Sequence, residues 1–148
     1  MQVSYDSVPL HDASGPVGFT AYANTGYPTP YNVNDIVIFD EVLSNFGGHY
    51  NPVTSSFICP WHGVYLMNAH VLGGLSDFML LNLMRNSELL AEINMDELTG
   101  VHNQGGMTIM TECDRGDILW IRAGYTGTIA AYPGQRYTSF TAYMLHRF

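Results

Sequence analysis

The chain has 148 residues, five arginines, no lysine and a formal net charge of −8 at pH 7. This length fits one domain, and we expect an N-terminal extension over residues 1–15 followed by a globular domain over residues 16–148. Because basic side chains supply most of the affinity for phosphate, the charge argues against nucleic acid and anionic membranes as partners. An acidic surface instead favours a neutral ligand, a cation or a basic protein patch.

Charged residues are scarce, at 12% of the chain against 47% hydrophobic residues, whereas soluble domains usually carry roughly 25% charged residues. Part of the surface must therefore lack charge. No apolar run approaches the roughly 18 residues that a membrane span requires, so we expect no membrane insertion. The uncharged surface is better assigned to contacts between copies of the chain, and we expect a homo-oligomer.

Short apolar runs separated by Gly, Pro, Asn and Asp recur about every eight to twelve residues, as is typical of an all-β sandwich or barrel. The Leu- and Met-rich stretch after Phe78 is also compatible with a helix. We expect two strands there, because its apolar residues fill consecutive positions and Asn86-Ser87 suits a tight turn. In chain order the expected strands are 16–22, 36–42, 55–60, 63–72, 77–85, 88–94, 106–113, 117–123 and 137–147.

The final expected strand carries apolar residues on both faces, with Tyr143 and Leu145 on one face and Phe140 and Met144 on the other. A sandwich whose outer face is also apolar again indicates packing between subunits. Large rings on separate strands are expected to define the core, each contributing roughly 1.5 to 3 kcal/mol when buried. These rings are Phe19, Phe39, Phe57, Tyr65, Trp120, Phe140 and Tyr143.

Cys59 and Cys113 are the only cysteines, too few for a disulfide-scaffold fold or a cysteine-based zinc site. They can form one bridge or stay free. Both lie in apolar, strand-like runs, which favours two buried thiols. The N-terminus has neither the basic start nor the apolar segment of a signal peptide, so the chain either is intracellular or has lost a leader.

An ordered series of motifs runs along the chain: Val17-Gly18-Phe19-Thr20-Ala21, Ile38-Phe39-Asp40-Glu41-Val42, Tyr50-Asn51-Pro52, Phe57-Ile58-Cys59-Pro60, Gly116-Asp117-Ile118-Leu119-Trp120 and Ser139-Phe140-Thr141-Ala142-Tyr143-Met144-Leu145. In order and spacing this series resembles the complement C1q globular-head (C1q domain) family of the tumour-necrosis-factor-like superfamily. The resemblance implies a two-sheet jelly-roll β-sandwich that is secreted, extracellular, stalkless and trimeric. Ser55, Met67 and Ala142 depart from the family pattern, but each stays small or apolar.

The sequence carries no Gly-x-Ser-x-Gly elbow, no phosphate loop and no evident carboxylate pair for glycoside cleavage, and the family it resembles is largely non-catalytic. We therefore do not expect an enzyme. Arg115-Gly116-Asp117 spells an integrin-binding tripeptide, but a turn before the following strand already accounts for it. The six histidines show no zinc-binding spacing.

One loop concentrates the hard oxygen ligands that calcium prefers, and its candidate metal ligands are Asp96, Glu97 and Asn103. A solvated acidic loop is the simpler alternative. The resemblance favours the metal, because some members of the family hold calcium near the trimer apex. Calcium is the only cofactor that we expect.

Aromatic residues gather in Pro- and Gly-rich turns, where binding residues tend to lie on a rigid scaffold. Their rings can stack on the C–H faces of sugars while neighbouring polar groups supply hydrogen bonds. For each ring taken alone, packing is the alternative explanation. The candidate ligand-binding residues are Tyr27, Tyr31, Trp61, His62, Tyr125, Tyr132 and Arg136.

Together these features lead to the hypothesis of a secreted pattern-recognition lectin of innate immunity. It would be a homotrimer whose outer loops bind microbial or host glycans weakly at each site and more strongly through multivalency. The alternative is an extracellular protein ligand or scaffold that engages a protein receptor. A third hypothesis is an acidic, calcium-associated matrix protein.

Overall fold

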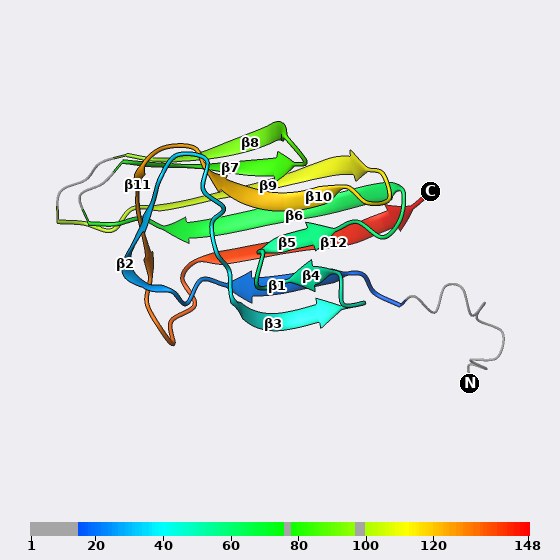
Figure 1. Ribbon diagram of the computed structural model, residues 1–148, viewed down its shortest axis with the longest axis horizontal. Coiled ribbons are helices and arrows are strands. Elements are labelled where there is room, and N and C mark those ends of the chain that lie inside the picture. The colour runs from blue at the N-terminus through cyan, green and yellow to red at the C-terminus, as the bar shows by residue number, and fades with distance from the viewer. Residues whose placement is uncertain (1–14, 76–77, 97–99) are drawn as a thin grey trace.

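Antiparallel strands of the computed structural model form two five-stranded sheets and a third, two-stranded sheet at one end (Figure 1). The structure describes residues 15–75, 78–96 and 100–148. The strands are β1 (Gly18–Tyr22), β2 (Gly26–Tyr31), β3 (Glu41–Phe46), β4 (Tyr50–Asn51), β5 (Ser56–Ile58), β6 (Gly63–Leu72), β7 (Met79–Arg85), β8 (Glu88–Met95), β9 (Gln104–Cys113), β10 (Ile118–Ala123), β11 (Gly127–Ala131) and β12 (Ser139–Arg147).

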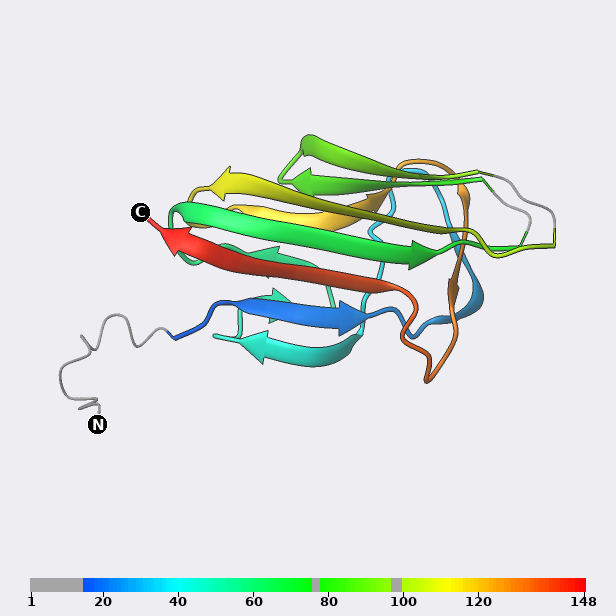
Figure 2. The same ribbon diagram turned by 180° about the vertical axis from the view of Figure 1, so that it is seen from behind.

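The first sheet has the order β3-β1-β12-β6-β9 and faces the viewer in Figure 2, and the second has the order β4-β5-β10-β7-β8. β11 and β2 form the third sheet. This arrangement confirms the expected all-β, jelly-roll sandwich. Among the residues that the structure describes, no helix is long and apolar enough to cross a membrane.

The core lies between the two large sheets and is rich in aromatic rings. Phe19 of β1 stacks on Tyr50 of β4 with ring centroids 3.9 Å apart, and its ring meets that of Phe140 edge-on at 4.8 Å. Five of the seven expected core rings are buried as predicted. Trp120 and Tyr143 are exceptions, because strand alternation turns them to the outer faces of their sheets.

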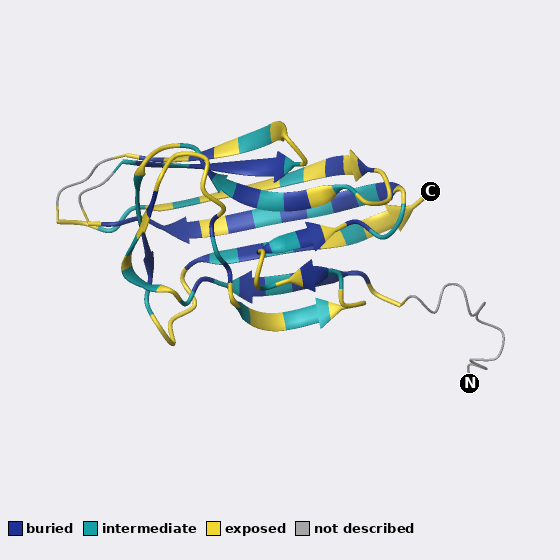
Figure 3. Cartoon of the chain, in the orientation of Figure 1, coloured by how far each residue is buried: buried dark blue, intermediate teal, exposed yellow. Residues whose placement is uncertain are grey.

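β6 has the predicted bounds, and its sequence explains why. Tyr65, Met67 and Ala69 are fully buried, whereas Leu66 and Asn68 between them are only partly covered. The same alternation of buried and exposed residues bands most long strands (Figure 3). A two-residue period of this kind is the strongest strand signal that a sequence carries.

The strand expected at 36–42 was wrong, since the strand β3 begins only at Glu41. A single bridge between Ile36 and Arg122 of β10, with side-chain hydrogen bonds, holds the backbone before β3 in place of an extended ladder. The Ile38 amide donates to the Tyr31 hydroxyl at 3.0 Å, and the Phe39 amide donates to the buried Ser55 hydroxyl at 2.8 Å. Val37 and Phe39 are nevertheless fully buried, which is why the run resembles a core strand.

The third sheet was not expected as strands. The sequence predicts Pro- and Gly-rich turns around Tyr27 and Tyr31, and β2 forms there although Pro28 and Pro30 have no amide hydrogen to donate. β2 pairs only with β11, so its other edge needs no ladder and tolerates proline.

The long strands run between two ends of the sandwich, visible at the right and left of Figure 1. We call one end the terminal pole, because it holds the C-terminal Phe148 together with residues 60–63 and 113–117. The opposite end, the distal pole, holds the third sheet and residues 100–103 and 132–138.

Candidate functional site

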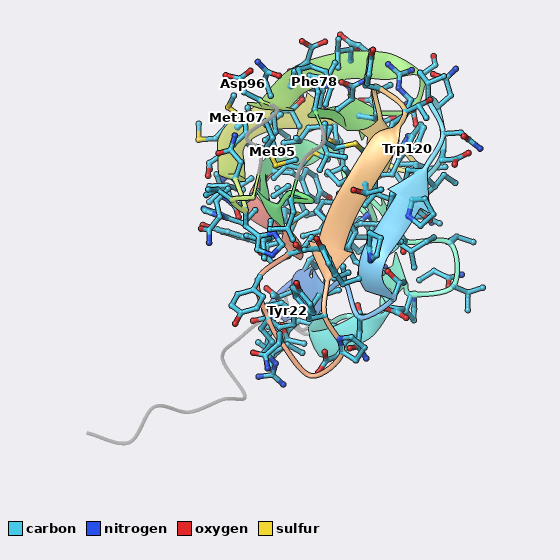
Figure 4. The ribbon with its side chains drawn as sticks, turned by 90° about the vertical axis from the view of Figure 1, so that its left-hand side faces the viewer. Tyr22, Phe78, Met95, Asp96, Met107 and Trp120 are labelled. Carbon is cyan, nitrogen blue, oxygen red and sulfur yellow. The ribbon has the colours of Figure 1, made fainter. Side chains whose placement is uncertain are left out.

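Four rings from three parts of the chain meet at the distal pole, and we call them the distal cluster: Tyr27, His102, Tyr132 and Tyr137. The Tyr27 and Tyr132 rings stack with centroids 4.7 Å apart. His102 packs edge-on against both, at 5.4 Å from Tyr27 and 5.9 Å from Tyr132. Tyr137 lies 6.5 Å from Tyr132 and is about half exposed. Figure 4 looks onto this pole, with Tyr22 and Phe78 labelled on separate sides of it.

Hydrogen bonds fix the His102 ring within the distal cluster. Its Nδ1 lies 2.8 Å from the Gly73 carbonyl oxygen, which can only accept, so Nδ1 carries a hydrogen. Nε2 of the neutral ring then accepts from the Tyr132 hydroxyl at 3.2 Å. Partial desolvation, with smaller contributions from Tyr27 and Tyr137, raises the pKa of Tyr132, which favours the protonated hydroxyl that this bond needs.

Two further candidate ligand residues lie at the distal pole but outside the cluster. The exposed Tyr125 ring packs edge-on against Phe78 at 4.9 Å. Arg136 lies over the Tyr22 ring at 5.2 Å, and its Nη2 is 3.5 Å from Oε1 of Glu41. An exposed ion pair of this kind contributes little, so Arg136 remains available to an incoming ligand.

Tyr31 is a correction to the candidate set. Its side chain is only 7% exposed, and its hydroxyl accepts the Ile38 amide hydrogen bond inside the sandwich. Burial raises the pKa of Tyr31, as expected for a phenol removed from water. Tyr31 therefore serves the core and cannot contact a surface ligand.

Trp61 and His62 lie at the terminal pole, away from the other candidates. The Arg147 guanidinium covers the Trp61 ring at 3.7 Å, and His62 Nε2 lies 2.7 Å from Oε1 of Glu112. A groove of about 340 Å³ opens beside Trp61. Its lining includes His49, Ile58, Pro60, Trp61 and Arg115. The candidate ligand residues are thus divided between two poles.

The candidate calcium ligands are placed only in part, because Glu97 lies outside the described residues. Asp96 is exposed at the distal pole, and the Asn103 side chain donates to the Asp96 backbone carbonyl at 3.3 Å. Within residues 15–75, 78–96 and 100–148, no group of three or more His, Cys, Asp or Glu side chains is arranged to hold a metal. Calcium binding stays a prediction.

The outer face of the first sheet carries two adjacent rows of uncharged residues. Directly paired positions on successive strands form an apolar row of Phe46, Gly18, Tyr143, Leu66 and Met110. The neighbouring row holds hydroxyl and amide side chains: Ser44, Thr20, Thr141, Asn68 and Thr108. A shallow groove of about 310 Å³ between β1, β3 and β12 is lined by members of both rows. We call this surface the uncharged face.

Sequence reasoning missed several parts of these sites. His102 and Tyr137 complete the distal cluster, yet nothing local in the sequence links them to Tyr27. The uncharged face was expected from apolar residues on both sides of the last strand, but its rows depend on the register between strands that are distant in sequence.

A family model for the C1q domain matches residues 18–145 of the chain. Caprin-2 of Danio rerio is 26% identical over 132 residues, which cover 88% of this chain and 14% of that protein. Complement C1q tumor necrosis factor-related protein 7 of Mus musculus is 25% identical over 112 residues, 74% of this chain and 38% of that protein. The chain therefore spans well under half the length of these curated relatives.

Solved structures with the same architecture include the globular domain of zebrafish complement 1qA protein, with a TM-score of 0.73 and 18% identity over 90% of this chain and 100% of that one. Eiger TNF from S. frugiperda gives a TM-score of 0.71 with 14% identity over 90% of this chain and 94% of that one. At these identities the likeness concerns the fold alone.

Proposed function

Because the chain belongs to the C1q domain family, we propose that it is a secreted, lectin-like binding domain whose homotrimers recognise neutral glycans on microbial or host surfaces in innate immunity. The observation that carries the proposal is the stacked pair of Tyr27 and Tyr132, held at the distal pole by His102. Such a fixed pair of rings offers a ligand a surface that needs little reordering on binding.

The chemistry of the distal cluster suits a sugar better than an anion. Partly exposed phenol rings stack on the C–H faces of a pyranose, and phenol hydroxyls donate or accept hydrogen bonds. The members of the cluster carry no formal charge when His102 is neutral, the form in which it accepts from Tyr132. A neutral ligand is therefore favoured over a phosphate or a carboxylate.

The uncharged face supports the trimer. Tyr143 is 41% exposed and Met110 is 68% exposed, so a continuous apolar row meets solvent in the isolated chain. A second copy would cover this row, and closed cyclic symmetry is the usual way in which identical chains satisfy such a surface. A three-fold axis along the long strands would place three distal clusters at the same end of the particle.

A glycan array, run with and without calcium, tests the proposed function. Binding to neutral glycans that free sugar blocks is the expected result. If the array shows no binding and the trimer binds saturably to a protein on cell surfaces, the proposal of glycan recognition fails and receptor engagement takes its place.

Receptor engagement is the second candidate, and the groove at the terminal pole favours it. Trp61, Arg115 and His49 line this groove and combine a ring with basic groups, a composition typical of protein interfaces. Substitution of Trp61 should then abolish cell binding while leaving glycan binding intact.

A further inference from the structure

The two cysteines come from opposite sheets and meet at the terminal pole. Cys59 follows β5 of the second sheet, and Cys113 ends β9 of the first. The Cys59 amide donates to the Asp117 carbonyl at 2.8 Å, and the Cys59 carbonyl accepts from the Gly116 amide at 2.8 Å. These bonds hold the Cys59 segment against the turn that directly follows Cys113.

The two thiols are free and buried. Cys59 is 0% exposed and Cys113 is 1% exposed. The interaction between the two thiols, with burial, raises the pKa of Cys59, and the same interaction lowers the pKa of Cys113.

A nearby cation favours the thiolate form of Cys113. The Arg85 guanidinium also lowers the pKa of Cys113, although its effect is smaller than that of Cys59, which lowers the pKa, and that of burial, which raises it. Arg85 is held in place because it donates to the Thr111 hydroxyl at 2.6 Å and pairs with Glu88 at 2.6 Å. A thiolate beside a cation is the form of cysteine that attacks disulfides.

We propose that Cys59 and Cys113 form a disulfide between the two sheets when the chain folds in the presence of a small-molecule disulfide. While the chain folds and before Cys113 is buried, the Cys113 thiolate attacks one sulfur of the oxidant, whose other half leaves as a thiolate. Cys59 then loses its proton and attacks the Cys113 sulfur of the mixed disulfide, which releases the second half. The protein loses two hydrogen atoms in total, and the oxidant becomes two thiols.

The bond would join strands that backbone pairing leaves separate. β5 and β9 belong to different sheets and have no ladder between them. A covalent tie at the terminal pole would therefore restrict the unfolded chain over the whole segment from β6 to β9, which is how disulfides chiefly stabilise proteins.

Refolding the full chain from denaturant in mixed oxidised and reduced glutathione tests the proposal. The refolded protein is denatured again without reductant and treated with an alkylating reagent, which modifies free thiols. Its mass is then measured by mass spectrometry. We expect no alkylation, a mass lower by two hydrogen atoms, and a proteolytic fragment that joins the Cys59 and Cys113 peptides. Two alkylated cysteines in protein that refolded under these conditions would overturn the proposal.

A second measurement uses stability. Reductant should lower the melting temperature of the oxidised protein by roughly 5 to 15 °C. The double variant Cys59→Ala, Cys113→Ala should melt at the same temperature with and without reductant. If that variant does not fold, the alkylation result on the native sequence still decides.

Discussion

Tyr143 of β12 lies directly opposite Gly18 of β1, and a Cβ atom added at Gly18 would lie 2.4 Å from the Cβ of Tyr143. Any side chain at residue 18 would therefore push Tyr143 off its neighbouring strand. With glycine there, the tyrosine and Gly18 both line the shallow groove of the uncharged face. The close approach of β1 and β12 at this pair therefore lies on the surface where we expect a second copy to dock.

Trimerisation is the first prediction. Light scattering at micromolar concentration should report about three chains per particle. Tyr143→Asp or Met110→Asp should dissociate the particle, because each would place a carboxylate in an apolar interface without a partner. Val53→Asp is the matched control, since Val53 is 84% exposed and lies outside the uncharged face. A wild-type chain that stays monomeric would contradict the prediction.

Truncation of the stacked rings is the second prediction. Tyr27→Ala and Tyr132→Ala should each weaken binding to a neutral polysaccharide by about 1 to 2 kcal/mol per site, the scale expected when a contacting ring is removed. Calorimetric titration measures the effect, while light scattering and a melting curve check that the trimer persists. Trp61→Ala removes a ring at the opposite pole and should leave glycan affinity unchanged. The reverse pattern would move the glycan site to the terminal pole.

Salt dependence gives a third prediction. The distal cluster holds no formal charge in the neutral form of His102, so affinity for a neutral polysaccharide should change little between low and moderate salt. Binding led by phosphate contacts would weaken markedly over the same range. A steep loss of affinity in salt titrations would therefore argue against this site.

Calcium is the fourth prediction. If Asp96, Glu97 and Asn103 bind the ion, then added calcium should raise the melting temperature by mass action. The double substitution Asp96→Asn, Glu97→Gln should abolish that rise, because it removes the charged oxygen ligands without a large change in size. Identical wild-type melting curves in calcium and in chelator would leave these residues as a solvated acidic loop.

Alkaline pH is the fifth prediction. Burial raises the pKa of Tyr50 to about 12, and its hydroxyl donates to the Phe39 carbonyl at 2.7 Å. Because this pKa lies above the unfolded value near 10, the stabilising effect is complete below pH 10 and is lost as pH rises toward 12. Roughly 2 to 3 kcal/mol of unfolding free energy should disappear over that range for this group.

Urea titrations at several pH values measure the alkaline effect. Tyr50→Phe should lose less stability between pH 10 and pH 12 than the native chain does, although it begins lower because the Phe39 carbonyl loses its partner. Burial also raises the pKa of Tyr65 to about 12, so part of the dependence should remain. An unchanged slope in Tyr50→Phe would show that this phenol titrates normally.

The family motifs and the two-residue alternation made the sandwich predictable. The bounds of β6 were predicted to the residue, and buried side chains alternate with more exposed ones from Gly63 to Val71. Buried residues outside any strand, such as Val37 and Phe39, misled the prediction, since burial and membership of a strand are separate properties. The prolines of β2 caused the opposite error, because they indicated a turn where the structure forms a strand.

The sequence predicted which residue types could form the candidate site, but not where on the fold they would lie. Most of the candidate ligand residues are at least partly exposed, and Tyr31 alone among them is buried in the core. Whether a loop reaches the terminal or the distal pole depends on sheet topology, which separates Trp61 from Tyr132. The His102 contact with Tyr132 depends on the same topology.

β12, the last strand in the chain, occupies the middle of the first sheet between β1 and β6. During synthesis on a ribosome, β1 and β6 would therefore emerge without the strand that joins them. The nascent chain therefore cannot close its first sheet until residues 139–147 have left the exit tunnel. Until then its apolar strands stay exposed, which favours aggregation, and a product that ends before β12 would lack the strand that joins β1 to β6.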